Sequence, residues 1–254
     1  MSATQHLISY EPATGAELWR GAHGDVDQTV EIARRAWPAW AAQPLAKRIE
    51  LVRRFVNEVR KDQNEFAELI ARETGKPLWE AKTEVEAVMA KVEISVRAYA
   101  DRTGQRKLDS ALQGTAALRH KPHGVMAVLG PYNFPAHLPN GHMVPALIAG
   151  NAVILKPSEK TPAVGEKLVE LFNRCGIPEG VVQLLIGGPE EGKALVAHRD
   201  VNGVLFTGSA QVGIAINKKL ATDPGKIVAL EMGGNNPIVL WDTPLLSDAA
   251  ALVI

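Results

Sequence analysis

The chain has 254 residues, of which 46% are hydrophobic and 22% charged, a length and composition typical of a globular protein with a substantial core. Its 28 basic and 28 acidic side chains cancel, which argues against nucleic-acid and membrane-surface binding. One cysteine, no signal peptide among the first thirty residues and no apolar run long enough to span a bilayer favour a soluble, cytoplasmic protein.

The N-terminal third predicts a short hairpin or irregular arm followed by helices. Turn residues are frequent up to about Gly24. Apolar residues then recur at helical spacing in three stretches, which are 26–40, 49–70 and 78–99. The first helix opens with a capping pair, Asp25 and Gln28, and Gly75 followed by Pro77 ends the second. We interpret all three stripes as core packing.

A polar, glycine-interrupted region follows at 101–124, and the alternating stretch 116–121 predicts a half-exposed strand. We expect an oligomerisation region at about 104–122. Beyond it, five short apolar strands alternate with helices, at 125–130, 152–157, 181–187, 203–208 and 226–233. This alternation predicts a doubly wound, mostly parallel α/β sheet whose ligand site lies at the carboxyl ends of the strands.

The last segment predicts a further strand at 237–241 and a helix that opens near Ser247 and has no C-terminus before Ile254. We therefore expect the chain to be truncated. No G-x-G-x-x-G follows any strand. A stretch similar to a phosphate-binding loop, 187–194, ends in alanine where the magnesium-binding hydroxyl would stand, so we interpret it as an ordinary connection.

Polar residues follow the predicted strands. The first strand is followed by Asn133, placed between two prolines, and the second by Lys156 and Glu159. An amide can stabilise an oxyanion, and a carboxylate can accept the hydroxyls of a ribose. The fourth strand leads into a helix start that can face a pyrophosphate, at Gly208, Ser209, Ala210, Gln211, Val212 and Gly213. The fifth ends at Glu231, which packing alone does not explain and which is the best catalytic candidate.

Together and in this order, PYNFP, GNAVILKPSE, FTGS and EMGGNNP resemble the aldehyde dehydrogenase superfamily from about Val125 to Pro237. The resemblance implies a Rossmann-like NAD-binding domain at 1–234 and the start of a largely absent catalytic domain at 235–254. It also implies oxidation of an aldehyde, with Asn133 as oxyanion donor and Glu231 as general base. Lys156 and Glu159 would bind the adenosine ribose, with Glu159 disfavouring the 2′-phosphate of NADP. Residues 208–213 would lie against the pyrophosphate and adenine.

HKPHGV, GPYNFPAHLPNGHMVPALIAGN and LEMGGNNP look most like the branch that oxidises N-succinylglutamate 5-semialdehyde in arginine breakdown. Two departures matter. Gly141-His142 stands where many members carry Trp-Lys, which would suit a larger substrate. The family's nucleophilic cysteine is also missing, since in the family it lies a few tens of residues beyond the position of Glu231 and only 23 residues remain here. We interpret Cys175 as structural. Another or broad-range aldehyde dehydrogenase and a non-catalytic NAD-binding module remain alternatives. We expect no metal, and a homo-oligomer when full length.

Overall fold

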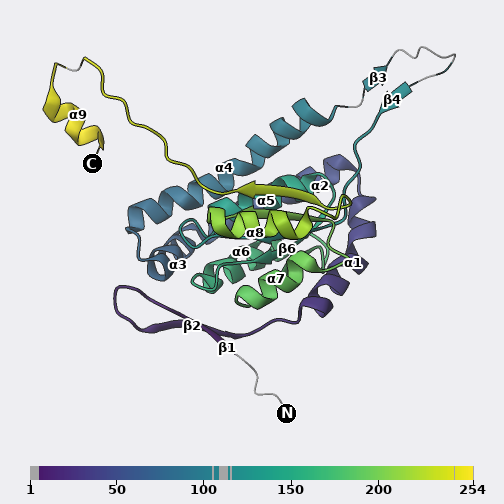
Figure 1. Cartoon of the computed structure of the whole chain (residues 1–254), viewed down its shortest axis with the longest axis horizontal. Helices are drawn as coiled ribbons and strands as arrows, with labels where there is room; N and C mark the ends of the chain where they lie inside the picture. The colour runs from purple at the N-terminus through teal and green to yellow at the C-terminus, as the bar shows by residue number, and fades with distance from the viewer. Residues whose placement is uncertain (1–5, 105, 109–113, 115, 243, 254) are drawn as a thin grey trace.

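Five parallel strands form the central sheet of the structure, a computed structural model that describes residues 6–104, 106–108, 114, 116–242 and 244–253. The strands are β5 (Val125–Leu129), β6 (Ala152–Lys156), β7 (Val182–Leu184), β8 (Gly203–Thr207) and β9 (Ile227–Glu231). They lie in the order β7-β6-β5-β8-β9 (Figure 1). The first two strands after the central β5 extend the sheet to one side and the next two to the other. The predicted doubly wound sheet is therefore confirmed.

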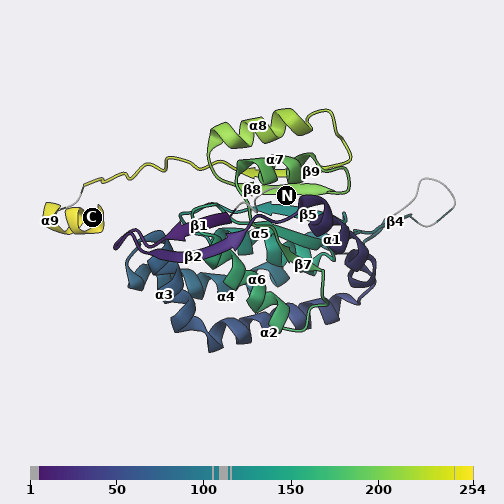
Figure 2. The same cartoon turned by 90° about the horizontal axis from the view of Figure 1, so that it is seen from below.

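Both faces of the sheet are covered by helices, which explains why its strands are almost uninterrupted apolar runs. Met126 and Val128 belong to the core on the side of α5 (His137–Ile148) and α6 (Pro162–Arg174). The alternate residue Ala127 belongs to the core on the side of α1 (Val26–Ala41), α7 (Pro189–Ala197) and α8 (Ala210–Leu220). Figure 2 shows the resulting layers, with α8 and α7 above the sheet, α1 at its edge and α6 below it.

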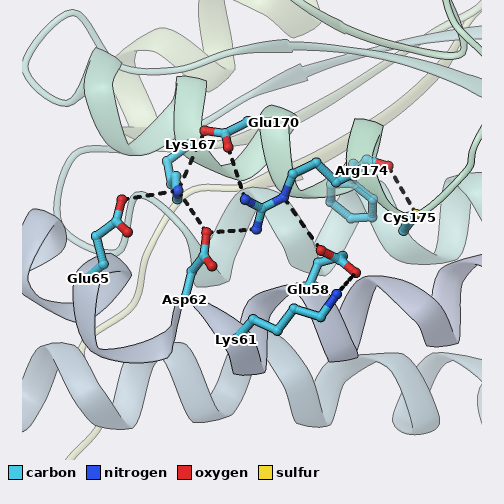
Figure 3. A network of polar contacts seen from close by, with 9 residues as sticks. Glu58, Lys61, Asp62, Glu65, Lys167, Glu170, Arg174 and Cys175 are labelled. Carbon is cyan, nitrogen blue, oxygen red and sulfur yellow. Dashed lines mark hydrogen bonds and ion pairs between the residues drawn. The ribbon is translucent and has the colours of Figure 1, made fainter.

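The predicted second helix is two helices, α2 (Leu45–Lys61) and α3 (Gln63–Thr74), so the prediction of one continuous helix at 49–70 is wrong. The break falls at Asp62, whose backbone has φ −103° and ψ 13°. Its carboxylate lies 2.9 Å from Lys167 Nζ and 2.7 Å from Arg174 Nη2, both on α6 (Figure 3). The chain thus changes direction between α2 and α3 where it contacts α6, a helix about a hundred residues further along the sequence. No local glycine or proline signals this break.

The same region contains the only cysteine, at the C-terminal end of α6. Phe55 of α2 stacks on Phe172 of α6 with ring centroids 3.8 Å apart, and Cys175 Sγ lies 3.0 Å from the Phe172 carbonyl oxygen. Burial raises the pKa of the Cys175 thiol to about 11. A buried, protonated thiol is a poor nucleophile, which supports the structural interpretation of this residue.

Two small hairpins flank the sheet. The N-terminal one, β1 (His6–Tyr10) with β2 (Glu17–Ala22), confirms the predicted hairpin and is held by a 2.6 Å hydrogen bond from Ser9 to Glu73 and a 2.8 Å one from Trp19 to Glu166. The other, β3 (Arg106–Leu108) with β4 (Ala116–Leu118), projects from the body beyond the long helix α4 (Leu78–Thr103) (Figure 1). Among the described residues, no helix combines the length and apolarity needed to cross a membrane.

The predicted strand at 237–241 is wrong. These residues form an extended segment that leads away from the sheet to α9 (Leu246–Val253) (Figure 1). A strand needs a neighbour to accept its hydrogen bonds, and none in the described part of the chain pairs with this segment. Its apolar side chains are consequently exposed, with Trp241 87% accessible.

Candidate active site at the carboxyl edge of the sheet

The sheet register brings the predicted site residues to one edge. Leu129 at the end of β5 pairs with Lys156 on one side and with Phe206 on the other, and Thr207 pairs with Glu231. Because the strands are parallel, their carboxyl ends meet here, and the chain changes direction of winding between β5 and β8. This is the switch point at which doubly wound sheets bind ligands.

The turn after β5 carries Asn133, which is exposed. Its backbone carbonyl accepts a 2.8 Å hydrogen bond from Lys76 Nζ, and the same ammonium lies 3.9 Å from the centroid of the Phe134 ring. At Gly130 an added Cβ would stand 2.7 Å from Pro139, so the turn packs tightly on the start of α5. The turn that presents Asn133 is thus fixed from outside the sheet.

A second side chain, Glu84 of α4, fixes the other end of this turn. Its carboxylate is fully buried, with Oε1 accepting the backbone N–H groups of Ala136 and His137 at 2.9 and 3.0 Å and Oε2 lying 2.9 Å from Lys76 Nζ. Ala136 has no side chain that can cap α5, so Glu84 supplies the cap from another helix. Sequence reasoning missed both Glu84 and Lys76. The available signal for Glu84 was its place next to Val85, in the apolar stripe of the predicted helix at 78–99, where a charged side chain is unexpected.

At the exit of β6, Lys156 is buried while Glu159 is exposed. Burial lowers the pKa of Lys156, although the carboxylates of Glu159 and Glu191 act to raise it. Glu159 and Tyr132 of the neighbouring turn both line a shallow cavity of about 380 Å³. The exits of β5 and β6 therefore form adjoining parts of one surface.

The exit of β8 is a tight turn into α8. Ser209 caps this helix, its hydroxyl accepting the N–H of Val212 at 3.4 Å. A Cβ added at Gly208 would stand 2.5 Å from the Phe206 ring, and one at Gly213 would stand 2.4 Å from Met232 Sδ. Residues 209–212 are exposed. An accessible helix N-terminus at this edge fits a bound phosphate group.

Glu231 ends β9 and is exposed at the same edge, beside Thr207. His142 of α5 reaches this point from below the sheet, with Nε2 2.9 Å from Thr207 Oγ1. Burial lowers the pKa of His142, opposed by the nearby Glu231 carboxylate and assisted by the positive charge of Lys91. The structure thus adds His142 to the surroundings of Glu231. This histidine belongs to the Gly141-His142 pair that stands where many family members carry Trp-Lys.

The structure brings all the predicted residues to one edge but does not connect all of them. Within the described residues, no hydrogen bond or ion pair joins the side chain of Asn133 to Glu231, or Lys156 to the turn at 208–213. Nor does that part of the chain contain a group of three or more His, Cys, Asp or Glu side chains able to hold a metal ion. The arrangement is an open surface with separate polar groups around the switch point.

The fold and this surface define a doubly wound α/β protein with its candidate site at the topological switch point. Comparison with known families identifies it further. The model of the aldehyde dehydrogenase family matches residues 1–254, and the chain belongs to that family.

Individual relatives agree with this assignment. N-succinylglutamate 5-semialdehyde dehydrogenase of Novosphingobium aromaticivorans is 76% identical over 252 residues, which are 99% of this chain and 54% of the relative. Betaine aldehyde dehydrogenase of Staphylococcus aureus in complex with NAD+ superposes with a TM-score of 0.85 at 26% identity, covering 91% of this chain and 48% of that one. Glyceraldehyde-3-phosphate dehydrogenase of Methanocaldococcus jannaschii complexed with NADP gives 0.84 at 26% identity, covering 93% and 52%. The chain thus spans about half the length of these proteins.

Proposed function

We propose that this chain is the NAD-binding part of an aldehyde dehydrogenase that oxidises N-succinylglutamate 5-semialdehyde. The observation that carries the proposal is the joint placement of Lys156, Glu159 and the start of α8 around the switch point of the sheet. A relative 76% identical is named for this reaction, which supports the choice of substrate. Because the chain spans about half of that relative, the activity belongs to the longer protein.

The residues present fit a dinucleotide. Glu159 is exposed and free to accept the hydroxyls of the adenosine ribose, with the Lys156 ammonium beside it, and the amides of the first turn of α8 can bind the pyrophosphate. NAD+ supplies the hydride acceptor when it is bound. This chain contributes the surface that orients the dinucleotide.

Two further residues take chemical roles in the proposal. The exposed amide of Asn133 donates a hydrogen bond to the aldehyde oxygen as negative charge develops on it, and the exposed carboxylate of Glu231 accepts a proton from water. The nucleophile expected from the family is a cysteine, and Cys175 is buried at the far end of α6 and does not take this part. Completing the reaction therefore requires residues that this chain does not supply.

Substrate size is the property that Gly141 would influence. A Cβ added there meets Lys91 Cε at 3.7 Å, an ordinary contact, so the position tolerates a larger side chain. We propose that the missing bulk admits the succinylated substrate. In the full-length enzyme Gly141→Trp should shift preference toward small aldehydes, and an unchanged preference across a panel of aldehydes would refute this role.

The projecting β3–β4 hairpin supports the proposal of a homo-oligomer for the full-length protein. Its short strands stand outside the body and pair only with each other among the described residues, so their outer edges are available for a strand of another subunit (Figure 1). Sedimentation of the full-length protein with and without Leu118→Pro, which removes a donor from β4, tests the proposal. A variant that keeps the assembly of the parent would contradict it.

The first experiment on the chain itself is an equilibrium titration with NAD+ and, in parallel, with NADP+. We expect saturable binding that favours NAD+ and weakens when Glu159 is changed to Gln. Glu179→Gln, another exposed carboxylate outside the site, is the control and should bind as the parent does. A folded chain that binds neither dinucleotide would contradict the proposed cofactor site.

A further inference from the structure

The first turn of α7 lies against Lys156, the residue placed at the proposed ribose site. A Cβ added at Gly192 would stand 3.4 Å from Lys156 Cε, so the helix packs directly on the lysine side chain. Lys156 is 6% exposed, and its ammonium donates a hydrogen bond to the carbonyl of the adjacent Pro157 at 3.2 Å. An ammonium beside the N-terminus of a helix is a combination that attracts phosphate.

In this chain a carboxylate of the helix itself occupies that N-terminus. Glu191 folds back over the turn, so that Oε2 accepts the N–H of Gly188 at 2.7 Å and Oε1 lies 2.8 Å from His23 Nδ1. The turn has room for this only because residue 187 is glycine, since an added Cβ would stand 2.4 Å from Glu191 Cγ. The carboxylate is therefore held in place from two directions and by the shape of the turn.

The charge balance around Lys156 follows from this geometry. Two carboxylates, those of Glu159 and Glu191, act on one ammonium. Burial acts to raise the pKa of Glu191, but hydrogen bonds from His23 and from backbone amides outweigh it and lower the pKa, so the group is ionised at neutral pH. Two carboxylates thus face the one ammonium that could otherwise bind a phosphate of a dinucleotide.

We infer that Glu191 is a second residue that determines specificity for NAD+ over NADP+. It acts with Glu159 to exclude the 2′-phosphate of NADP+ from the space next to the Lys156 side chain. The inference rests on the proposed function, in which Lys156 and Glu159 hold the adenosine ribose. A phosphomonoester carries close to two negative charges at neutral pH, so a fixed carboxylate near it weakens binding, whereas the neutral ribose hydroxyls of NAD+ are little affected. Exclusion of NADP+ is then shared between a residue on the β6 exit and one on α7.

The test is a titration of Glu191→Gln with NAD+ and NADP+. Glutamine keeps an oxygen that can accept the Gly188 N–H, so the cap of α7 survives while the charge is removed. We expect NADP+ affinity to rise about 3- to 10-fold, the size of one charge interaction at a partly exposed site, with NAD+ affinity changed less than about twofold. Combined with Glu159→Gln, the gain should exceed that of either single change.

The matched control is the neighbouring carboxylate. Glu190→Gln removes the same charge from the same turn, but Glu190 is 80% exposed and paired with Lys193 at 2.7 Å, so NADP+ affinity should stay that of the parent. An equal gain in this control would show a general field effect and overturn the role of Glu191. NAD+ binding with no gain for NADP+ in Glu191→Gln would overturn it as well, leaving the proposed function intact.

Salt provides a measurement that needs no variant. Repulsion between Glu191 and the phosphate should be screened, so the preference of the parent chain for NAD+ over NADP+ should narrow as NaCl is raised from about 0.05 M to about 0.5 M. A preference that is independent of salt would overturn the inference. Failure of the folded parent to bind NAD+ at all would instead remove the proposed function, and this inference with it.

Discussion

The ammonium of Lys76 lies 2.9 Å from Glu84 Oε2, and together the two residues hold both ends of the turn that carries Asn133. Lys76 donates to the Asn133 carbonyl, and Glu84 accepts the backbone N–H groups at the start of α5. Neither residue belongs to the sheet. The position of the proposed oxyanion donor is therefore set by α4 and by the loop that precedes it.

Changing Glu84 to Ala should destabilise the chain by about 3 kcal/mol, because it removes the nearer of the two carboxylates that pair with the Lys76 ammonium and leaves only Glu80, at 3.6 Å. Two backbone N–H groups at the start of α5 also lose their acceptor. Urea unfolding followed by circular dichroism measures the loss. Glu86→Ala, an exposed position on the same helix, should cost less than about 0.5 kcal/mol, and equal losses for the two variants would contradict the assigned role.

Strands and ligand edge could be predicted from the sequence because their signals are local. Apolar runs such as 152–155 predict buried parallel strands, and parallel strands place their exits at one edge of the sheet. Lys156 and Glu231 could therefore be assigned to the same surface from the sequence. The family motifs stand at these exits, which is why the resemblance and the register agree.

The remaining features depend on contacts between distant parts of the chain. The helix break at Asp62 coincides with its ion pairs to Lys167 and Arg174 on α6. One carboxylate oxygen of Glu84 accepts a backbone N–H group at the start of α5, more than fifty residues further along the chain, and the other pairs with Lys76. The segment 237–241 has the composition of a strand, but composition does not supply the neighbour that a strand requires. Long-range partners of this kind leave little trace in a single sequence.

The thiol of Cys175 should react slowly while the chain is folded. With its pKa raised to about 11 by burial, the thiolate fraction at pH 8 is about 100-fold lower than for a thiol with the ordinary pKa of about 9. Labelling with Ellman's reagent at pH 8 should therefore proceed slowly in buffer and rapidly in denaturant. Fast labelling of the folded chain would contradict the structural role, and Cys175→Ser should leave the affinity for NAD+ unchanged.

Asp62 should stabilise the junction of α2 and α3 through its two partners on α6 (Figure 3). We expect Asp62→Ala to lower the free energy of unfolding by about 1 kcal/mol at low salt, and by less at high salt, because the charges are partly exposed and screened. Asp101→Ala on α4 is the control, since this exposed side chain makes no ion pair within the described residues. A loss that does not depend on salt would show that the ion pairs are not its source.

His142 should make stability depend on pH. Burial lowers its pKa in the folded state, despite the opposing charge of Glu231, so the unfolded chain binds a proton more readily between the folded pKa and the ordinary value of 6.5. Stability in that interval consequently rises with pH and is lost as pH falls, by at most about 1.4 kcal/mol per pH unit for one group. His137 shares this direction, because burial lowers its pKa too.

We therefore expect His142→Gln to reduce the loss of unfolding free energy between about pH 7.5 and pH 5 without abolishing it. The exposed His120→Gln should retain the full dependence. A His142→Gln variant with an unchanged pH profile would show that the pKa of His142 is not lowered in the folded chain.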